Sequence, residues 1–220
     1  MTSYRSSLAT FLQFEINPIN LSPCGLYAFK RIAVAANNAL EKHMADNNSA
    51  FGWSRTGSRP LRIILLDGPN MPNLGNRNKR VYGPIASIEA LHTYVKEVGA
   101  KLGVTIEAFA SNHKGCILDE IHRTAAQCDA YIVNPAGLTK TGEPTRHALE
   151  ETGKPWIEVH FSNISAPPWS GRGLPGGPWE SNFTRSATGM SMGLRHHSYL
   201  AALIGLVSAI DDEDFLGKRD

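Results

Sequence analysis

From Leu61 onward, short apolar runs alternate with amphipathic segments, and this alternation restricts the possible fold more than any other feature. The first run, Leu61–Leu66, breaks into the loop Asp67–Asn70, as a buried strand does at its end. Further strands are expected at 104–110, 130–133 and 156–160, and helices at 87–102, 117–126, 145–151 and 199–210. Strands joined by helices form parallel sheets covered on both faces, so we expect a single-domain α/β fold with a doubly wound parallel sheet.

Two regions lie outside this alternation. Residues 1–60 are expected to be an N-terminal extension, a packing arm or tail with one helix at about Tyr27–Met44 or with partial disorder. Residues 167–193, rich in Gly, Pro and Ser, indicate a long loop without secondary structure, which acts as a lid, a contact surface or a disordered segment. The chain thus divides into an extension and one domain, 61–220, that carries this insert.

Charge and cysteine content favour a small-molecule ligand. The formal net charge is +2 and the basic residues are scattered, which argues against nucleic acid as a partner. The three cysteines form neither a disulfide framework nor a zinc motif, so we expect an intracellular, cytoplasmic protein without metal. No apolar run is long enough to span a membrane, while a weak organellar transit peptide stays an open alternative.

Polar side chains follow each expected strand. Asn70 comes after the first strand, 111–113 after the second, Asn134 after the third, and 158–163 end the fourth. Ligands of parallel α/β sheets bind at the carboxyl ends of the strands. The four loops are therefore predicted to converge on one cleft.

Two residue pairs in these loops suit acid–base chemistry. A phenol titrates near 10 and needs a neighbouring cation to act as a base, and Arg77 precedes Tyr82 by five positions in a glycine-containing loop. Glu158 and His160 alternate along a strand and face the same side, where a carboxylate favours the protonated, acid-competent imidazole.

Each of these residues has a structural interpretation when taken alone. Tyr82 could anchor a loop, Glu158 with His160 could form an ion pair, and Asn134 before a proline could make a turn. Their joint placement at the strand ends favours the functional interpretation instead. Three other histidines are expected to be solvated on helix surfaces: His43, His92 and His122.

The order and spacing of five sequence blocks resemble one enzyme family, the type II 3-dehydroquinate dehydratases. The blocks are 68–83, 111–115, 134–139, 157–163 and 195–199, and the resemblance covers about Leu61–Asp211 except the insert. It implies a flavodoxin-like fold, trimers grouped into a homo-oligomeric dodecamer, and anti elimination of water from 3-dehydroquinate through an enolate. It also implies a ring carboxylate as substrate, with neither cofactor nor metal.

The resemblance assigns a role to each matching residue. Tyr82 corresponds to the base, Arg77 to the cation that favours its phenolate, and His160 to the acid. Glu158 corresponds to the carboxylate that orients the histidine, and Asn70 to the residue that holds a water at the enolate oxygen. Contacts to the substrate's hydroxyls and carboxylate are implied for Asn134, Phe161, Ser162 and Arg195.

This sequence departs from the family pattern within the expected site. Asn78 and Lys79 replace a glutamate and a proline, and Lys114 replaces another glutamate. Lys140 stands for a histidine, and His147 for an aspartate that reaches a neighbouring subunit's substrate, so we count both as substrate-binding candidates. The more positive pocket favours a tyrosinate and an anionic ligand, but lysine cannot accept a hydrogen bond.

Three functions are consistent with these observations. The leading hypothesis is a lyase that converts 3-dehydroquinate to 3-dehydroshikimate in the shikimate pathway or quinate catabolism. The departures and the insert favour a second, a relative that transforms another carbocyclic or polyketide-like β-hydroxy ketone in specialised metabolism. The third is a catalytically silent binding homologue, against which the retained acid–base residues argue.

Overall fold

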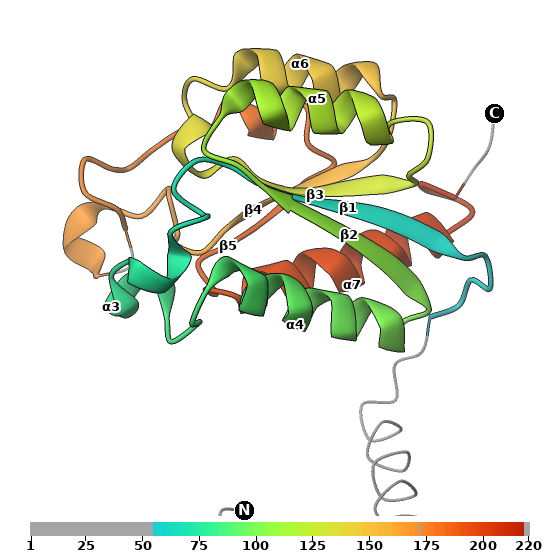
Figure 1. The fold of residues 1–220 in the computed structure, drawn as a ribbon, viewed down its shortest axis with the longest axis horizontal. Helices are drawn as coiled ribbons and strands as arrows, with labels where there is room; N and C mark the ends of the chain where they lie inside the picture. Colours follow the sequence, from blue (N-terminus) through green and yellow to red (C-terminus); the bar gives the residue numbers. More distant parts are fainter. Residues whose placement is uncertain (1–54, 172, 218–220) are drawn as a thin grey trace, which may run out of the picture. The chain divides into compact units, whose positions relative to one another are not determined.

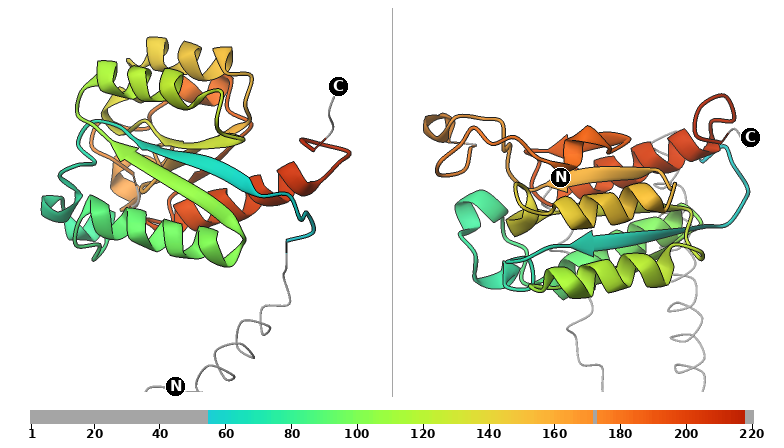
Figure 2. Two further views of the ribbon diagram at one scale, coloured as in Figure 1. Left: turned by 45° about the vertical axis from the view of Figure 1, so that its right-hand side comes forward. Right: turned by 90° about the horizontal axis from the view of Figure 1, so that it is seen from above.

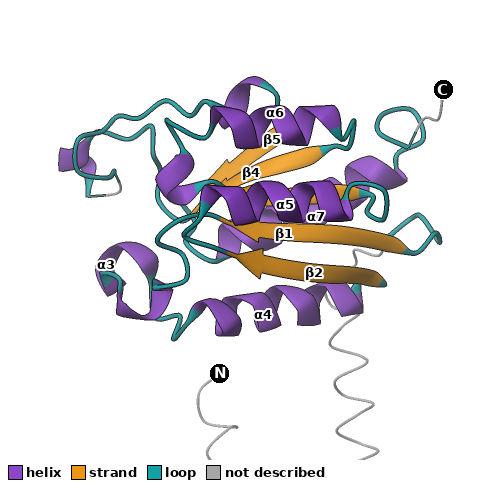
Figure 3. Ribbon diagram, turned by 45° about the horizontal axis from the view of Figure 1, so that its top comes forward, coloured by secondary structure: helices purple, strands orange, loops and turns teal. Residues whose placement is uncertain are grey.

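Five parallel strands form the centre of the molecule in the order β2-β1-β3-β4-β5. Figure 3 shows β2 and β5 at opposite edges of this sheet. The order is that of flavodoxin-like doubly wound folds, in which the chain reverses direction between β1 and β3. The expected fold class is confirmed. The strands are β1 Leu61–Asp67, β2 Val104–Ala110, β3 Ala130–Asn134, β4 Trp156–His160 and β5 Gly189–Met192.

Helices cover both faces of the sheet. In the computed structural model, which describes residues 55–171 and 173–217, helices α4 and α7 lie on one face and α5 and α6 on the other (Figure 1). The helix expected at 27–44 lies outside these residues. The helices are α3 Lys79–Tyr82, α4 Ile88–Lys101, α5 Lys114–Thr124, α6 Glu143–Glu151 and α7 His197–Asp211, with 3-10 turns at Leu74–Asn76, Ala136–Leu138, Pro168–Ser170 and Phe183–Arg185.

The strand and helix patterns explain how two cores form. Ile63 and Leu65 of β1 pack toward α4 and α7, whereas Ile64 and Leu66 pack toward α5 and α6, because successive side chains leave a strand on opposite faces. All four are fully or almost fully buried. Helix α4 begins after Ser87, whose hydroxyl accepts a bond of 3.2 Å from the amide of residue 90, as an N-cap does.

The prediction that the insert lacks secondary structure is wrong. Its last part forms strand β5, which pairs with β4 in parallel, and Phe183 buries its ring edge-on against Trp156, with centroids 6.2 Å apart. The sequence Gly-Met-Ser-Met of β5 has no apolar alternation from which a strand could be inferred. The pairing forms because β5 satisfies the outer edge of β4.

The segment before β1 is bound to the end of the domain. Arg55 makes two hydrogen bonds to the carboxylate of Asp211, of 2.7 and 2.8 Å, and both side chains are nearly buried. A bidentate pair of this kind fixes position as well as charge. Arg55, assigned above to the extension, is therefore attached to the domain that begins at Leu61.

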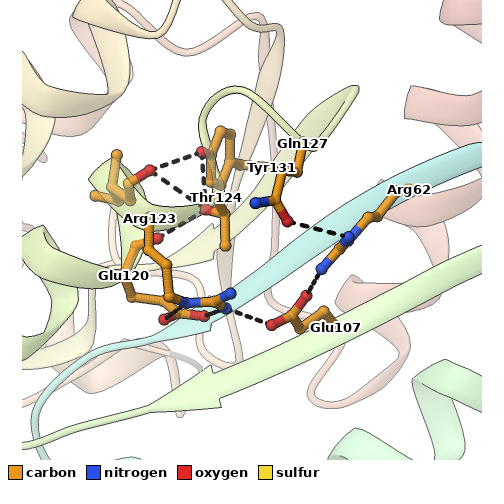
Figure 4. A network of polar contacts seen from close by, with 8 residues as sticks. Arg62, Glu107, Glu120, Arg123, Thr124, Gln127 and Tyr131 are labelled. Carbon is orange, nitrogen blue, oxygen red and sulfur yellow. Dashed lines mark hydrogen bonds and ion pairs between the residues drawn. The ribbon is translucent and has the colours of Figure 1, made fainter.

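A polar network ties β1 and β2 to α5 (Figure 4). Arg62 of β1 binds Glu107 of β2, which Arg123 of α5 also contacts, while Arg123 holds Glu120 at 2.6 Å. Half-exposed ion pairs of this kind contribute little individually to the stability of the fold.

Of the helices in the part of the chain described, none is long and apolar enough to cross a membrane.

Candidate active site

A cavity of about 250 Å³ opens at the carboxyl ends of β1, β3 and β4. This volume lies just under the range of roughly 300–1,000 Å³ that is usual for ligand pockets, and suits a small molecule. Figure 2 shows α3 and the insert extending beyond the same end of the sheet. Seven of the residues proposed from sequence line the cavity together: Asn70, Arg77, Tyr82, Asn134, His160, Phe161 and Ser162.

Gly68 allows the first loop to approach the third. Its α-carbon lies so close to Pro135 that an added Cβ would stand 2.2 Å from that residue's carbonyl oxygen. Asn70 follows with a φ of 75°, a left-handed conformation that asparagine tolerates better than most residues. The backbone N–H of Asn70 donates a hydrogen bond of 2.8 Å to Asn112 Oδ1, which links the loops that follow the first two strands.

Tyr82 and Arg77 form one side of the cavity. The guanidinium lies 3.6 Å from the centre of the phenol ring and donates a hydrogen bond from Nη2 to the phenol oxygen. Tyr82 ends the single-turn helix α3, which Asn78 caps by accepting a bond of 2.9 Å from the amide of Arg80. The expected loop is thus partly helical here, and its cap is one of the residues that depart from the family pattern.

The electrostatic balance at Tyr82 differs from the expectation. Burial raises the pKa of Tyr82 above its ordinary value, and the charge of Arg77 offsets this only in part. Burial likewise lowers the pKa of Arg77, against the opposing effects of Tyr82 and Tyr199. The guanidinium acts in the expected direction, but in this closed arrangement desolvation of the phenol is the larger effect.

His160 and Glu158 form a second pair at the end of β4. His160 Nε2 lies 2.7 Å from Glu158 Oε1, and both side chains are buried. This confirms that they share one face of the strand. Burial raises the pKa of Glu158, but hydrogen bonds from His160, Ser181 and Thr184 outweigh it, so the pKa lies below its ordinary value. An ionised carboxylate is therefore held against the imidazole.

A buried polar cluster, which the sequence did not indicate, holds Asn134. Its Nδ2 donates to Tyr199 Oη at 2.7 Å and to Asp67 Oδ1 at 3.2 Å, and its Oδ1 accepts from the amide of Ala136 at 3.1 Å. Both amide protons are used, so Asn134 can offer a ligand only its remaining acceptor capacity. Burial and the neighbouring Asp67 raise the pKa of Tyr199 well above its ordinary value.

His92 belongs to the same cluster, so the expectation that it is solvated is wrong. Its Nε2 lies 3.0 Å from Asp67 Oδ2, and only 13% of its side chain is exposed. Asp67 is fully buried at the end of β1, where a carboxylate must find donors. An aspartate that closes an apolar run is the one sequence signal for this cluster. His122 is exposed, as expected.

Four candidates do not line the cavity: Glu158, described above, and Arg195, Lys140 and His147. The exposed Arg195 donates from Nη2 to the carbonyl of Arg80 at 2.8 Å and borders an adjoining pocket of about 280 Å³. Lys140 places its ammonium 5.0 Å from the ring centre of Trp179. More than half of the His147 side chain is exposed.

The insert supplies one wall of the cavity. Leu174, Pro175 and Trp179 line it beside Ile164, and the Trp179 amide donates to the Ile164 carbonyl at 2.7 Å. This wall is apolar and anchored to the chain that follows β4. The aromatic residues of this otherwise Gly/Pro-rich insert were the sequence signal for such a wall. Composition alone does not show which way their side chains point.

Comparisons with known proteins identify one enzyme family. Residues 61–207 match the family model "Dehydroquinase class II". The chain is 36% identical over 147 residues to "Catabolic 3-dehydroquinase 1" of Aspergillus terreus, covering 66% of this chain and 90% of that protein. It is 32% identical over 161 residues to "3-dehydroquinate dehydratase" of Gloeobacter violaceus, covering 72% and 85%.

A solved structure supports the same relationship. The type II dehydroquinase from Butyrivibrio crossotus superimposes with a TM-score of 0.59 and 28% sequence identity, covering 68% of this chain and 99% of that one. The fold, the family match and the length shared with these relatives all agree. The chain therefore belongs to the class II dehydroquinase family, a family of hydro-lyases.

Proposed function

We propose that the protein catalyses the anti elimination of water from 3-dehydroquinate, which gives 3-dehydroshikimate, in quinate catabolism or the shikimate pathway. One observation carries the proposal: a phenol with its cation lines the same small cavity as an imidazole, and a buried carboxylate contacts that imidazole. The name of the relative from Aspergillus terreus favours the catabolic role.

In the proposed first step, the phenolate of Tyr82 takes a proton from the carbon beside the ketone. The electrons of the broken C–H bond form the enolate, whose oxygen lies toward Asn70 and a water that it holds. Arg77 favours the phenolate by its charge. Because burial keeps the pKa of Tyr82 raised, the phenolate fraction, and with it the rate of proton removal, grows as the pH rises.

In the proposed second step, the enolate reforms the ketone with a double bond beside it, and the C–O bond of the leaving hydroxyl breaks. Imidazolium His160 protonates the departing oxygen, which leaves as water. Because Nε2 is held by Glu158, the proposal assigns the proton donation to Nδ1. Tyr82 then loses its proton and His160 regains one, so the cycle is redox-neutral and requires no cofactor or metal.

A second candidate function is the transformation of another ring β-hydroxy ketone by the same acid and base. Lys140 and His147 stay outside the cavity, whereas the insert contributes Trp179 to it. A pocket with this apolar wall favours a substrate with an apolar face on that side. The two candidates share their chemistry and differ in the ligand.

Turnover of 3-dehydroquinate by the purified full chain, followed by the ultraviolet absorbance of the conjugated product, tests the proposal. We expect turnover that Tyr82→Phe and His160→Ala each reduce by about 10²–10⁴-fold. Tyr94→Phe serves as the matched control, because Tyr94 lies on α4 against His196 and does not line the cavity. A wild-type protein that does not convert 3-dehydroquinate contradicts the proposal, and tight binding of a different ring acid then favours the second candidate.

Assembly and location complete the proposal. We include the trimer-based dodecamer and the cytoplasmic location that the family resemblance implies. Light scattering of the purified chain measures the mass, and a monomer contradicts this part of the proposal.

A further inference from the structure

Both carboxylate oxygens of Glu158 are occupied. Oε1 lies 2.7 Å from His160 Nε2, and Oε2 accepts a hydrogen bond of 2.7 Å from Thr184 Oγ1. Glu158 is completely buried, where an unpaired carboxylate oxygen would be costly. The partner of the second oxygen comes from outside the strand that carries the acid–base pair.

Thr184 is held in place by the packing of the insert. It lies in the 3-10 turn Phe183–Arg185, and the Phe183 ring is fully buried. Gly142 makes room for that ring, since a Cβ there would stand 2.6 Å from it. The backbone N–H of Asn182 also donates to the Thr139 carbonyl at 2.9 Å. The exposed Thr184 is therefore fixed by its neighbours in sequence.

Among the described residues, few charged groups interact with Glu158. On the neighbouring strands, its register partners are Val133 of β3 and Met190 of β5. On α6, Arg146 is paired with Glu143 and Glu150 instead. Among the residues that the structure describes, His160 is thus the titratable partner of Glu158, and hydroxyls from the insert supply the rest.

We propose that Thr184, contributed by the insert, is a positioning residue for the acid half of the reaction, which it serves by holding Glu158 in the orientation and charge state that support His160. The inference rests on the proposed dehydratase function. Burial raises the pKa of Glu158, and the bonds from His160, Ser181 and Thr184 bring it below its ordinary value. Without the hydroxyl of Thr184 the pKa rises, so on acidification the carboxylate is lost at a higher pH.

Three variants test the inference in the 3-dehydroquinate assay. Thr184→Val removes the hydroxyl at nearly constant volume, and we expect kcat to fall about tenfold, KM to stay the same, and the acid limb of the kcat profile to move to higher pH. Thr184→Ser should restore kcat and the position of the acid limb. Thr188→Val is the matched control, because the Thr188 hydroxyl accepts from the Trp156 amide at 3.2 Å and does not contact Glu158.

A titration without substrate separates this inference from the proposed function. The imidazole resonances of His160, assigned by their loss in His160→Ala, are followed against pH by NMR in the full chain. Thr184→Val should shift the titration and Thr184→Ser should not. If the wild type fails to convert 3-dehydroquinate, the proposed function fails while this titration still decides the role of Thr184. An unchanged titration in Thr184→Val, or equal effects of valine and serine, overturns the inference.

Discussion

The buried strand residues at the cavity, here called the inner wall (Asn134 and His160, which line it, with Glu158 beside His160), are held more firmly than the side chains of its rim (Lys140, His147 and Arg195). The inner-wall residues are buried at strand ends, each with fixed partners. The rim residues are exposed and directed to other groups, as Lys140 is to Trp179. The difference teaches that the acid half of the pair, His160 with Glu158, is built into the sheet, whereas the rim side chains belong to loops and to helix α6.

The largest effect is expected at the inner wall. Glu158→Gln removes the charge that supports imidazolium His160 while keeping the shape, so kcat should fall by about 10²–10⁴-fold. Steady-state kinetics measures this. Glu120→Gln is the control, because Glu120 is also buried but pairs with Arg123 on α5. Equal losses in both variants would mean that the inner wall has no special role.

A smaller effect is expected at the wall that the insert contributes. Trp179→Ala removes an apolar surface of the cavity, so KM should rise about tenfold with little change in kcat, as lost binding area does. Trp169→Ala is the control, since the Trp169 side chain lies in the same insert and is 85% exposed. A loss confined to kcat would place Trp179 among the groups that act on the transition state.

The pH dependence of kcat/KM tests the role of Tyr82 as the base. Arg77→Gln removes the charge that partly offsets burial at Tyr82, so the pKa of Tyr82 rises further and the alkaline rise of kcat/KM moves to higher pH. The sign is fixed, because the base works deprotonated. A pH profile measured with Arg80→Gln, a neighbouring arginine outside this cavity, should match the wild type. A profile that Arg77→Gln leaves unmoved would remove the guanidinium from the mechanism.

The smallest effects are expected at the rim. Lys140→Ala and His147→Ala should each change kcat/KM by less than about threefold, because exposed charges interact weakly with a ligand in the cavity. The same kinetic assay decides. A loss of a hundredfold in either variant would show that a rim side chain turns inward or reaches the site of another subunit, and would remove the distinction between rim and inner wall.

The sequence predicted the parts of the site that local periodicity controls. Glu158 and His160 stand two positions apart on a strand, and Arg77 precedes Tyr82 by five positions in the same loop. The pairing within each of these two pairs follows from short-range geometry. The parallel sheet and its ligand-binding edge followed from the alternation of strands and helices, whereas the flavodoxin-like arrangement was implied by the family resemblance. The two side-chain pairs could be predicted because each depends on a few neighbouring residues.

The parts that the sequence did not predict depend on distant contacts or on orientation. Asp67 and Tyr199 are 132 positions apart, and no local pattern joins them. Strand β5 has no alternation, and its pairing depends on the available edge of β4. A matching motif places Lys140 in the chain but does not orient its side chain, which Trp179 of the insert attracts.

The central claim is that Tyr82 removes the proton and His160 expels the hydroxyl from one shared ligand. Hydrogen–deuterium exchange at the carbon beside the ketone, followed by NMR in D₂O, separates the two steps. The account predicts that His160→Ala exchanges this hydrogen without forming the elimination product, whereas Tyr82→Phe does neither. Exchange that persists in Tyr82→Phe, or that His160→Ala abolishes while Tyr82→Phe retains it, would contradict the account.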